Sequence, residues 1–231
     1  MRTAILLFAI ITHALSADLH GVIAQSQRLK DTSEPYAVLG RVSVGEGVTL
    51  AVGPSVRIDG MQNGFMHIRG RVILGGQKAK PVVLDGGAWK GHVYARHCSV
   101  AKATIEIDHQ KASGHSTGFE WSVFVDSRVR GGHYAACTFT GGTMDTAQSF
   151  AGCVFKNVAV QSPYALMACS RCVFTNCTFG SNSSQHLPDD VAITTCSFDD
   201  ASWASLQAAL GKMTFPRGEL LIRNAALPRR D

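Results

Sequence analysis

The sequence predicts an all-β chain that is wound as a repetitive solenoid, and three observations support this prediction. From about Tyr36 onward, short runs of aliphatic residues alternate with turns that contain glycine. Two short motifs recur at intervals of roughly 20 residues, a length typical of one solenoid coil. A helical pattern of apolar residues appears only near the C-terminus. Together these observations favour stacked strand-and-turn units over a helical or mixed fold.

The first recurring motif is an aliphatic residue, any residue, an aliphatic residue and an aspartate. It ends at Asp59, Asp85, Asp108 and Asp126, which are 26, 23 and 18 residues apart. Leucine-rich repeats need recurrent leucine and asparagine positions that these segments lack, and propeller blades need about 40 residues. The motif therefore indicates one strand and one turn in each coil of a solenoid.

The second recurring motif is Cys-x-Phe, which contains five of the seven cysteines: Cys137, Cys153, Cys172, Cys177 and Cys196. Alternate residues of a strand face the same side, so each cysteine shares the side of a phenylalanine that belongs in the core. Buried free thiols are the preferred interpretation, because free cysteine packs as a small hydrophobic residue. Since seven thiols cannot all pair, at least one is free or is shared with another chain.

Two alternatives for the cysteines stay open. Cysteines in neighbouring coils would lie within the range of a disulfide, and Cys169–Cys172 or Cys172–Cys177 are the most crowded pairs. Metal ligation is the weakest interpretation, because Cys169-x-x-Cys172 supplies only half of a zinc ligand pattern. We therefore expect no metal site.

The stretch CVFTNCTFG, residues 172–180, places two Cys-x-Phe motifs five residues apart. Both phenylalanines can be buried only if the chain turns at Thr175 and Asn176, because an odd spacing reverses the side on a straight strand. We expect Cys172 to continue the series of Cys137 and Cys153. We expect Cys177 to open a second series that reaches Cys196.

Three segments carry a resemblance to a known family: GVTLAVGPSVRIDG (47–60), MHIRGRVILGGQKAKPVVLDGGAWKGHVY (66–94) and FTNCTFGSN (174–182). They resemble the right-handed parallel β-helix of pectin-lyase-like proteins. The resemblance implies a single-stranded right-handed parallel β-helix of about seven to eight coils over residues 36–199. It implies a fold and not a function, because both enzymes and binding modules use such coils.

The first sixteen residues predict a signal peptide, and hence an exported protein. Arg2 precedes the apolar run of residues 4–11, and Ala14 and Ser16 provide the small residues of a cleavage site before Ala17. The mature chain contains no stretch long enough for a transmembrane helix. Removal of Arg2 lowers the net charge from +5 to +4, and the basic residues are scattered, so nucleic acid is not an expected partner.

The two ends of the solenoid need covers for their exposed strand edges. Residues 17–35 are the expected N-terminal segment or cap, and residues 200–231 the expected cap helix and tail. Trp203, Leu206 and Leu210 have the spacing of one helical face over residues 200–211, and Gly211 follows as a stop signal.

Catalytic members of the resembled family act on acidic polysaccharides by β-elimination or hydrolysis, which implies carboxylates, a base and cationic groups. The candidate catalytic residues are Asp108, Asp126, Arg128 and Arg130, and the candidate ligand-binding residues are His109 and His133. We expect Asp108 and Asp126, 18 residues apart, to end equivalent strands, a placement that would allow them to stack. The structural interpretation is the preferred one, since aspartate favours turns and alternating arginines suit a solvated strand face.

The function predicted from the sequence is that of an exported β-helix protein that binds a polysaccharide or a cell-envelope partner without catalysis and without a cofactor. A small polysaccharide lyase or glycosidase that acts on acidic glycans is the first alternative. A structural surface module is the second alternative. His92 and His97 lie five residues apart on opposite strand faces, so they are not expected to share a metal.

Overall fold

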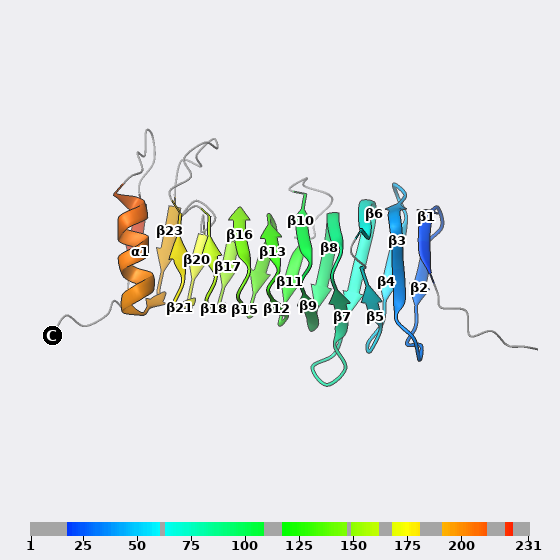
Figure 1. Ribbon diagram of the computed structural model, residues 1–231, viewed down its shortest axis with the longest axis horizontal. Coiled ribbons are helices and arrows are strands. Elements are labelled where there is room, and N and C mark those ends of the chain that lie inside the picture. The colour runs from blue at the N-terminus through cyan, green and yellow to red at the C-terminus, as the bar shows by residue number, and fades with distance from the viewer. Residues whose placement is uncertain are drawn as a thin grey trace, which may run out of the picture.

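The protein is a parallel β-helix solenoid with one helix at its C-terminal end (Figure 1). The computed structural model describes residues 18–60, 63–108, 117–146, 149–161, 168–180, 191–211 and 220–223. The predicted signal peptide, residues 1–16, lies outside these described residues. Within the described residues, no helix has the length and apolar character needed to cross a membrane.

Most coils contribute strands to three faces, and every ladder between named strands is parallel. Face 1 is formed by the first two residues of β3 (Tyr36–Val44) and by β5 (Arg57–Asp59), β7 (Val82–Asp85), β9 (Cys98–Ala101), β12 (Val123–Val125), β15 (Thr138–Thr140), β18 (Val154–Lys156), β21 (Val173–Thr175) and β24 (Ser197–Phe198). The other two faces follow in the direction of the chain.

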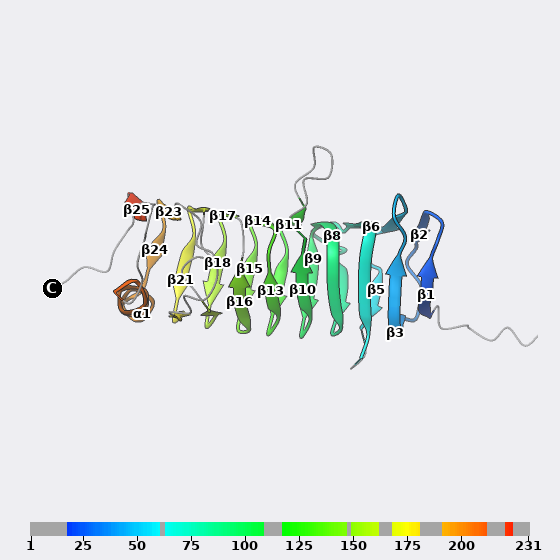
Figure 2. The ribbon, with the colours of Figure 1, turned by 90° about the horizontal axis from the view of Figure 1, so that it is seen from above.

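Face 2 contains β1 (Leu19–Ile23), the remainder of β3, the first parts of β6 (Phe65–Gly75) and β8 (Ala88–Arg96), β10 (Thr104–Ile107), β13 (Arg128–Arg130), β16 (Thr143–Thr146), β19 (Ala159–Val160) and β22 (Thr178–Phe179). Face 3 contains β2 (Gln27–Leu29), β4 (Thr49–Val52), the last parts of β6 and β8, β11 (Gly118–Glu120), β14 (His133–Ala135), β17 (Ser149–Ala151), β20 (Ala168–Ser170), β23 (Val191–Thr194) and β25 (Leu220–Arg223). The strands follow one another along the long axis, with β1 and β2 at one end (Figure 2).

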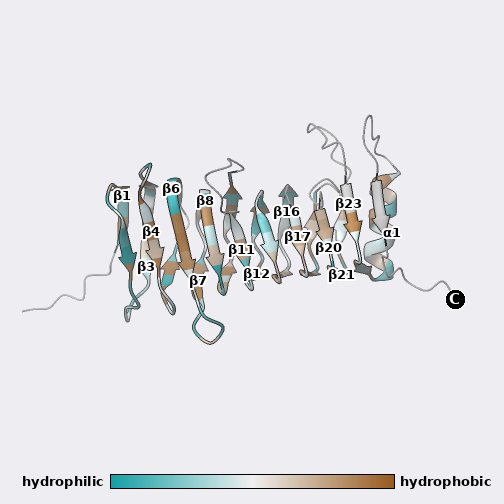
Figure 3. Ribbon diagram, turned by 180° about the vertical axis from the view of Figure 1, so that it is seen from behind, coloured by the Kyte–Doolittle hydropathy of each residue, from teal (hydrophilic) through white to brown (hydrophobic). Residues whose placement is uncertain are grey.

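The core consists of ladders of like side chains. The central ladder of face 1 stacks nine residues in register: Tyr36, Ile58, Leu84, Val100, Phe124, Phe139, Phe155, Phe174 and Phe198. Its successive phenylalanine rings are nearly parallel, with centroids 4.6, 5.0, 4.6 and 4.8 Å apart. This spacing equals the distance between hydrogen-bonded strands, about 4.8 Å. Apolar stretches recur along strands such as β6 (Figure 3).

The chain turns sharply at two corners of most coils. At the first corner, between faces 3 and 1, one buried residue follows each turn, and these residues form the ladder Val56, Val82, Cys98, Ser122, Cys137, Cys153, Cys172 and Cys196. At the second corner, between faces 1 and 2, the corresponding ladder is Ala103, Ser127, Gly142, Val158 and Cys177. From Cys98 and Ala103 onward, the residue before each ladder residue has a positive φ.

All seven cysteines are free and buried, which confirms the preferred interpretation from the sequence. The expected turn between the two Cys-x-Phe motifs is also present, because Asn176 has a φ of 49° between β21 and β22. The expected series from Cys177 to Cys196 is wrong. Cys196 stacks on Cys172, whose carbonyl accepts a 2.8 Å hydrogen bond from Ser197 N. Both corners take a small residue with a core side chain two positions later, and Cys177 and Phe179 give the second corner the same motif as the first, so the motif alone does not tell them apart.

The ladder cysteines also act as hydrogen-bond donors. The thiols of Cys137, Cys172 and Cys196 donate to the carbonyls two residues earlier over 3.3–3.4 Å between sulfur and oxygen. The hydroxyl of Ser122 does the same over 2.9 Å, to the carbonyl of Glu120. A small side chain with one donor therefore suits this corner, which explains why cysteine and serine share the ladder.

The predicted cap helix is confirmed as α1 (Asp200–Leu210), which lies over the last coil. Asp199 is its N-cap and accepts a 2.8 Å hydrogen bond from Ser202 N. Ser202 in turn accepts a 2.8 Å hydrogen bond from Cys177 N, an edge group of the second corner. Leu206 is fully buried, and Trp203 packs against the core beside it. The helix therefore covers the strand edge and satisfies its exposed donors.

Candidate functional site

The two candidate carboxylates do not stack. Asp108 follows β10 on face 2, whereas Asp126 follows β12 on face 1. The expectation that they end equivalent strands is wrong, because strands on both faces end in the same aliphatic pattern. Asp126 has a φ of 46° at the second corner, a left-handed conformation that aspartate tolerates better than most residues.

Both candidate arginines form ion pairs with Asp145. Arg128 donates from Nε and Nη2 to Oδ2 of Asp145, over 2.9 and 2.6 Å. Nε of Arg130 lies 3.6 Å from the same oxygen. Asp145 is the extra residue where the register between β13 and β16 shifts, so a β-bulge turns its carboxylate toward both arginines. The cluster therefore has the form of an ion-pair network on face 2.

The structure describes one of the two candidate histidines. His109 lies outside the described residues. His133 is half-buried on face 3, and its Nδ1 lies 2.6 Å from Oγ of Ser149 in the next coil. His92 lies on β8, whereas His97 lies in the first corner, so the structure does not bring these two histidines together.

An aromatic residue that the sequence analysis did not single out stands at the first corner. Trp121 has a φ of 47° and leaves 49% of its surface exposed. Its ring stacks on that of His97 in the preceding coil, with centroids 5.5 Å apart and planes 19° apart. The guanidinium of Arg96 lies 4.9 Å from the ring centroid of Trp121 and donates to Glu120 over 2.9 Å. We call Arg96, His97, Glu120 and Trp121 the Trp121 corner.

Basic residues continue along the same edge of the solenoid on both sides of the Trp121 corner. Lys78 and Lys80 are exposed in the turn of residues 76–81, which occupies the first corner one coil before His97. In the coils after Trp121, the corner residues are Ala136, Gly152 and then the exposed Arg171. A Cβ added to Gly152 would meet no atom within 4 Å. The indole therefore projects beside two small residues, followed by a cation roughly 14 Å along the axis, three coils away.

The chemistry of the Trp121 corner combines a stacked aromatic pair with cations. An indole face offers a flat apolar surface, and a guanidinium offers paired donors for a carboxylate. Aligning Glu120-Trp121-Ser122 with Arg96-His97-Cys98 would have found this site, because both triplets lead from a face 3 strand into a face 1 strand.

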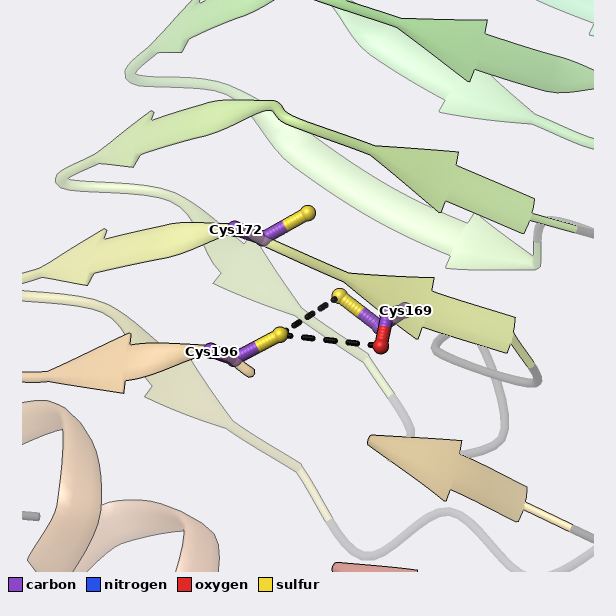
Figure 4. A group of neighbouring side chains, drawn as sticks. All are labelled: Cys169, Cys172 and Cys196. Carbon is purple, nitrogen blue, oxygen red and sulfur yellow. Dashed lines mark hydrogen bonds between the residues drawn. The ribbon is translucent and has the colours of Figure 1, made fainter. Parts of the chain in front are cut away.

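A second cluster could hold a metal. The sulfur atoms of Cys169, Cys172 and Cys196 all lie within 4.8 Å of one another, and all three residues are buried (Figure 4). Hydrogen bonds with Cys172 and Cys196 raise the pKa of the Cys169 thiol well above its usual value. Sequence reasoning identified the Cys169-x-x-Cys172 pair but not Cys196, which joins it from the next coil.

We compared the chain with protein-family models, with curated proteins and with solved structures, and none of these three comparisons found a match. The arguments for a function therefore rest on the residues and contacts described above.

Proposed function

We propose that this protein is an exported, non-catalytic module that binds an acidic polysaccharide along the first corner, with Trp121 as the central contact. The observation that carries the proposal is the conformation and exposure of Trp121, with its φ of 47° and its half-exposed indole. A left-handed backbone costs about 1–2 kcal/mol for a residue with a side chain. Backbone strain of this kind concentrates at functional sites, where the side chain has a use that compensates for it.

The shape of the edge suits a chain of sugars that runs along the solenoid axis. The indole can stack on the apolar face of one sugar ring, as exposed tryptophans do at wet binding surfaces. Ala136 and Gly152 leave space for the next sugar units beside the indole.

The charges of the edge favour an acidic glycan over a neutral one. Lys78, Lys80, Arg96 and Arg171 are basic, and Glu120 is the acidic residue paired with Arg96. Exposed ion pairs contribute little, at most about 1 kcal/mol, so a sugar carboxylate can replace Glu120 as the partner of Arg96 at small cost. The guanidinium geometry supports paired hydrogen bonds to that carboxylate.

Binding is favoured over cleavage by the placement of the candidate catalytic groups. Hydrolysis needs two carboxylates at a fixed short separation across the bond, whereas Asp108 and Asp126 follow strands of different faces. The arginines that would neutralise a uronate are held by Asp145 instead. Export to the cell envelope or the medium is the part of this proposal that rests on residues 1–16.

The test is a binding screen of the mature chain against uronate-containing and neutral polysaccharides. We expect retention by acidic glycans and a loss of affinity of at least about tenfold for Trp121→Ala, equivalent to about 1.4 kcal/mol. Alanine is compatible with this corner, because Ala136 adopts the same conformation one coil later, with a φ of 50°. Val173→Ala, at an exposed position on face 1, is the matched control and should bind like wild type.

Two results would contradict the proposal. Equal affinity of wild type and Trp121→Ala for the glycan would show that Trp121 does not contact it. Ultraviolet absorbance from unsaturated sugar products, or the release of reducing ends, would show turnover and favour the lyase or glycosidase alternative.

A further inference from the structure

We propose that Cys169, Cys172 and Cys196 form a binding site for a soft monovalent metal ion, Cu(I). The site is independent of the Trp121 corner. In the described part of the chain, these residues are the only set of three or more histidine, cysteine or acidic side chains whose ligand atoms converge in this way.

The three sulfurs come from two successive coils. Cys169 lies on β20 of face 3, and Cys172 precedes β21 of the same coil. Cys196 precedes β24 in the next coil, and its sulfur lies 3.6 Å from both the sulfur and the carbonyl oxygen of Cys169. Sulfurs that share one ion at about 2.3 Å are about 3.8–4.0 Å apart. The Cys169–Cys196 separation is slightly shorter than this value, and the sulfur of Cys172 lies within 4.8 Å of both, so small rotations of the side chains would complete the coordination.

The position of Cys169 separates this cluster from the other buried thiols. The face 3 ladder contains Phe119, Tyr134 and Phe150, and the next residue in register is Cys169. A cysteine thus replaces an aromatic ring at the one coil where it faces two thiols of the first-corner ladder. Cys137 and Cys153 donate instead to the carbonyls of Phe119 and Tyr134, and their thiols lie outside the set.

The number and type of ligands select the ion. Thiolates favour soft ions such as Cu(I) and zinc. Structural zinc takes four ligands, and the described residues supply three thiols at this position. Cu(I) accepts three sulfur ligands in a plane, which matches the set without a further residue. Each thiol that becomes a thiolate releases its proton to solvent when the ion binds.

The site lies close to the C-terminal end of the solenoid, near α1 (Figure 4). The last coil carries Cys196 and is covered by the helix. Ends of a repeat array open locally at lower free energy than the middle. An ion can therefore enter through opening of the last coil, or during folding.

The experiment loads the reduced full chain with Cu(I), without oxygen and against a competing chelator, both before refolding and after it. We expect one tightly held Cu(I) per chain and an ultraviolet thiolate-to-copper band. Cys196→Ser should lower retention at least tenfold and abolish the band. Serine fits this ladder, because Ser122 occupies the equivalent position between Cys98 and Cys137.

Cys137→Ser is the matched control, since it removes a buried thiol of the same ladder that lies outside the cluster. It should retain copper like wild type, and circular dichroism should confirm the fold of both variants. The proposal is overturned if wild type retains no copper, or if both variants retain equal amounts. A disulfide between Cys169 and Cys196 in protein purified without reductant would also overturn it.

Discussion

The two corners of the solenoid impose the same backbone conformation on different kinds of residue. At the first corner, the residues with positive φ are His97, Trp121, Ala136, Gly152, Arg171 and Thr195. At the second corner, they are Lys102, Asp126, Gly141, Asn157 and Asn176. Glycine, asparagine and aspartate tolerate this conformation best, and they fill most of the second corner. The second corner therefore follows backbone preference, whereas the first corner carries side chains that this preference does not explain.

The two corners also differ in the contacts that their corner residues make. At the second corner, Nδ2 of Asn176 donates to Oδ1 of Asn157 over 2.8 Å, so the corner residues bond to one another between coils. At the first corner, the indole of Trp121 stacks on His97 and is half exposed. Residues of both corners therefore contact one another between coils, through a hydrogen bond between two amides at the second corner and through a half-exposed aromatic ring at the first.

The largest expected effect comes from filling the tight space at the second corner. A Cβ on Gly142 would lie 2.2 Å from the carbonyl oxygen of Ser127 and 2.6 Å from its nitrogen, and φ is 75°. Gly142→Ala must shift backbone, so we expect unfolding free energy to fall by at least about 3 kcal/mol.

Gly152→Ala at the first corner is the matched control for this prediction. It has a φ of 62° and open space around the added methyl group, so the expected loss is about 1 kcal/mol. Urea denaturation of both variants measures the difference. Equal losses would show that the second corner is no tighter than the first.

The sequence was sufficient to predict the parts of the fold that local patterns specify. Alternation places Cys137 beside Phe139 in the core, and the spacing of Trp203 and Leu206 identifies the cap helix. The pairing of coils was harder to predict, because it depends on the lengths of the segments between the strands. Cys196 joins Cys172 and not Cys177 only once each strand is assigned to a face.

The same limitation affected the candidate site. Asp108 and Asp126 share a motif, but the motif does not record which face its strand occupies. Trp121 belongs to no repeated sequence motif. It was singled out by its backbone conformation at the corner, which cannot be predicted from the residue type. Its contacts with His97 and Arg96 appear only when the coils are stacked.

An intermediate effect is expected from alkaline pH, because the first corner is lined with thiols. Burial raises the pKa of Cys98 to about 12, from an ordinary value of 9.0. A hydrogen bond with Cys137 is the largest cause that raises the pKa of Cys153, also to about 12. Above the ordinary value, the unfolded chain has lost these protons while the folded chain keeps them. Unfolding free energy therefore falls as pH rises through this window, by about 1.4 kcal/mol per pH unit per thiol.

Denaturation of the reduced protein at several values between about pH 8 and about pH 11 measures this slope. Cys98→Ser removes one of the thiols and should make the slope shallower by about 1.4 kcal/mol per pH unit. The second corner contains Cys177 as its single ladder thiol in the described residues. A slope that is unchanged in Cys98→Ser would mean that the first-corner thiols do not govern the alkaline loss.

The smallest expected effect is also the one that separates the two corners most sharply. Trp121→Asn gives the first corner the residue type that the second corner uses at Asn157 and Asn176. The change relieves about 1–2 kcal/mol of left-handed strain and loses about 0.5–1 kcal/mol of exposed cation–π contact with Arg96. Loss of the stacking on His97 offsets most of the remainder, so we expect a change in unfolding free energy within about 0.5 kcal/mol.

A buried aromatic residue of the core would instead cost about 3–5 kcal/mol when truncated. A loss above about 1.5 kcal/mol would make Trp121 a packing residue, because the corner would then need its ring to fold. Unchanged stability together with lost glycan affinity would mean that the ring is retained for its ligand.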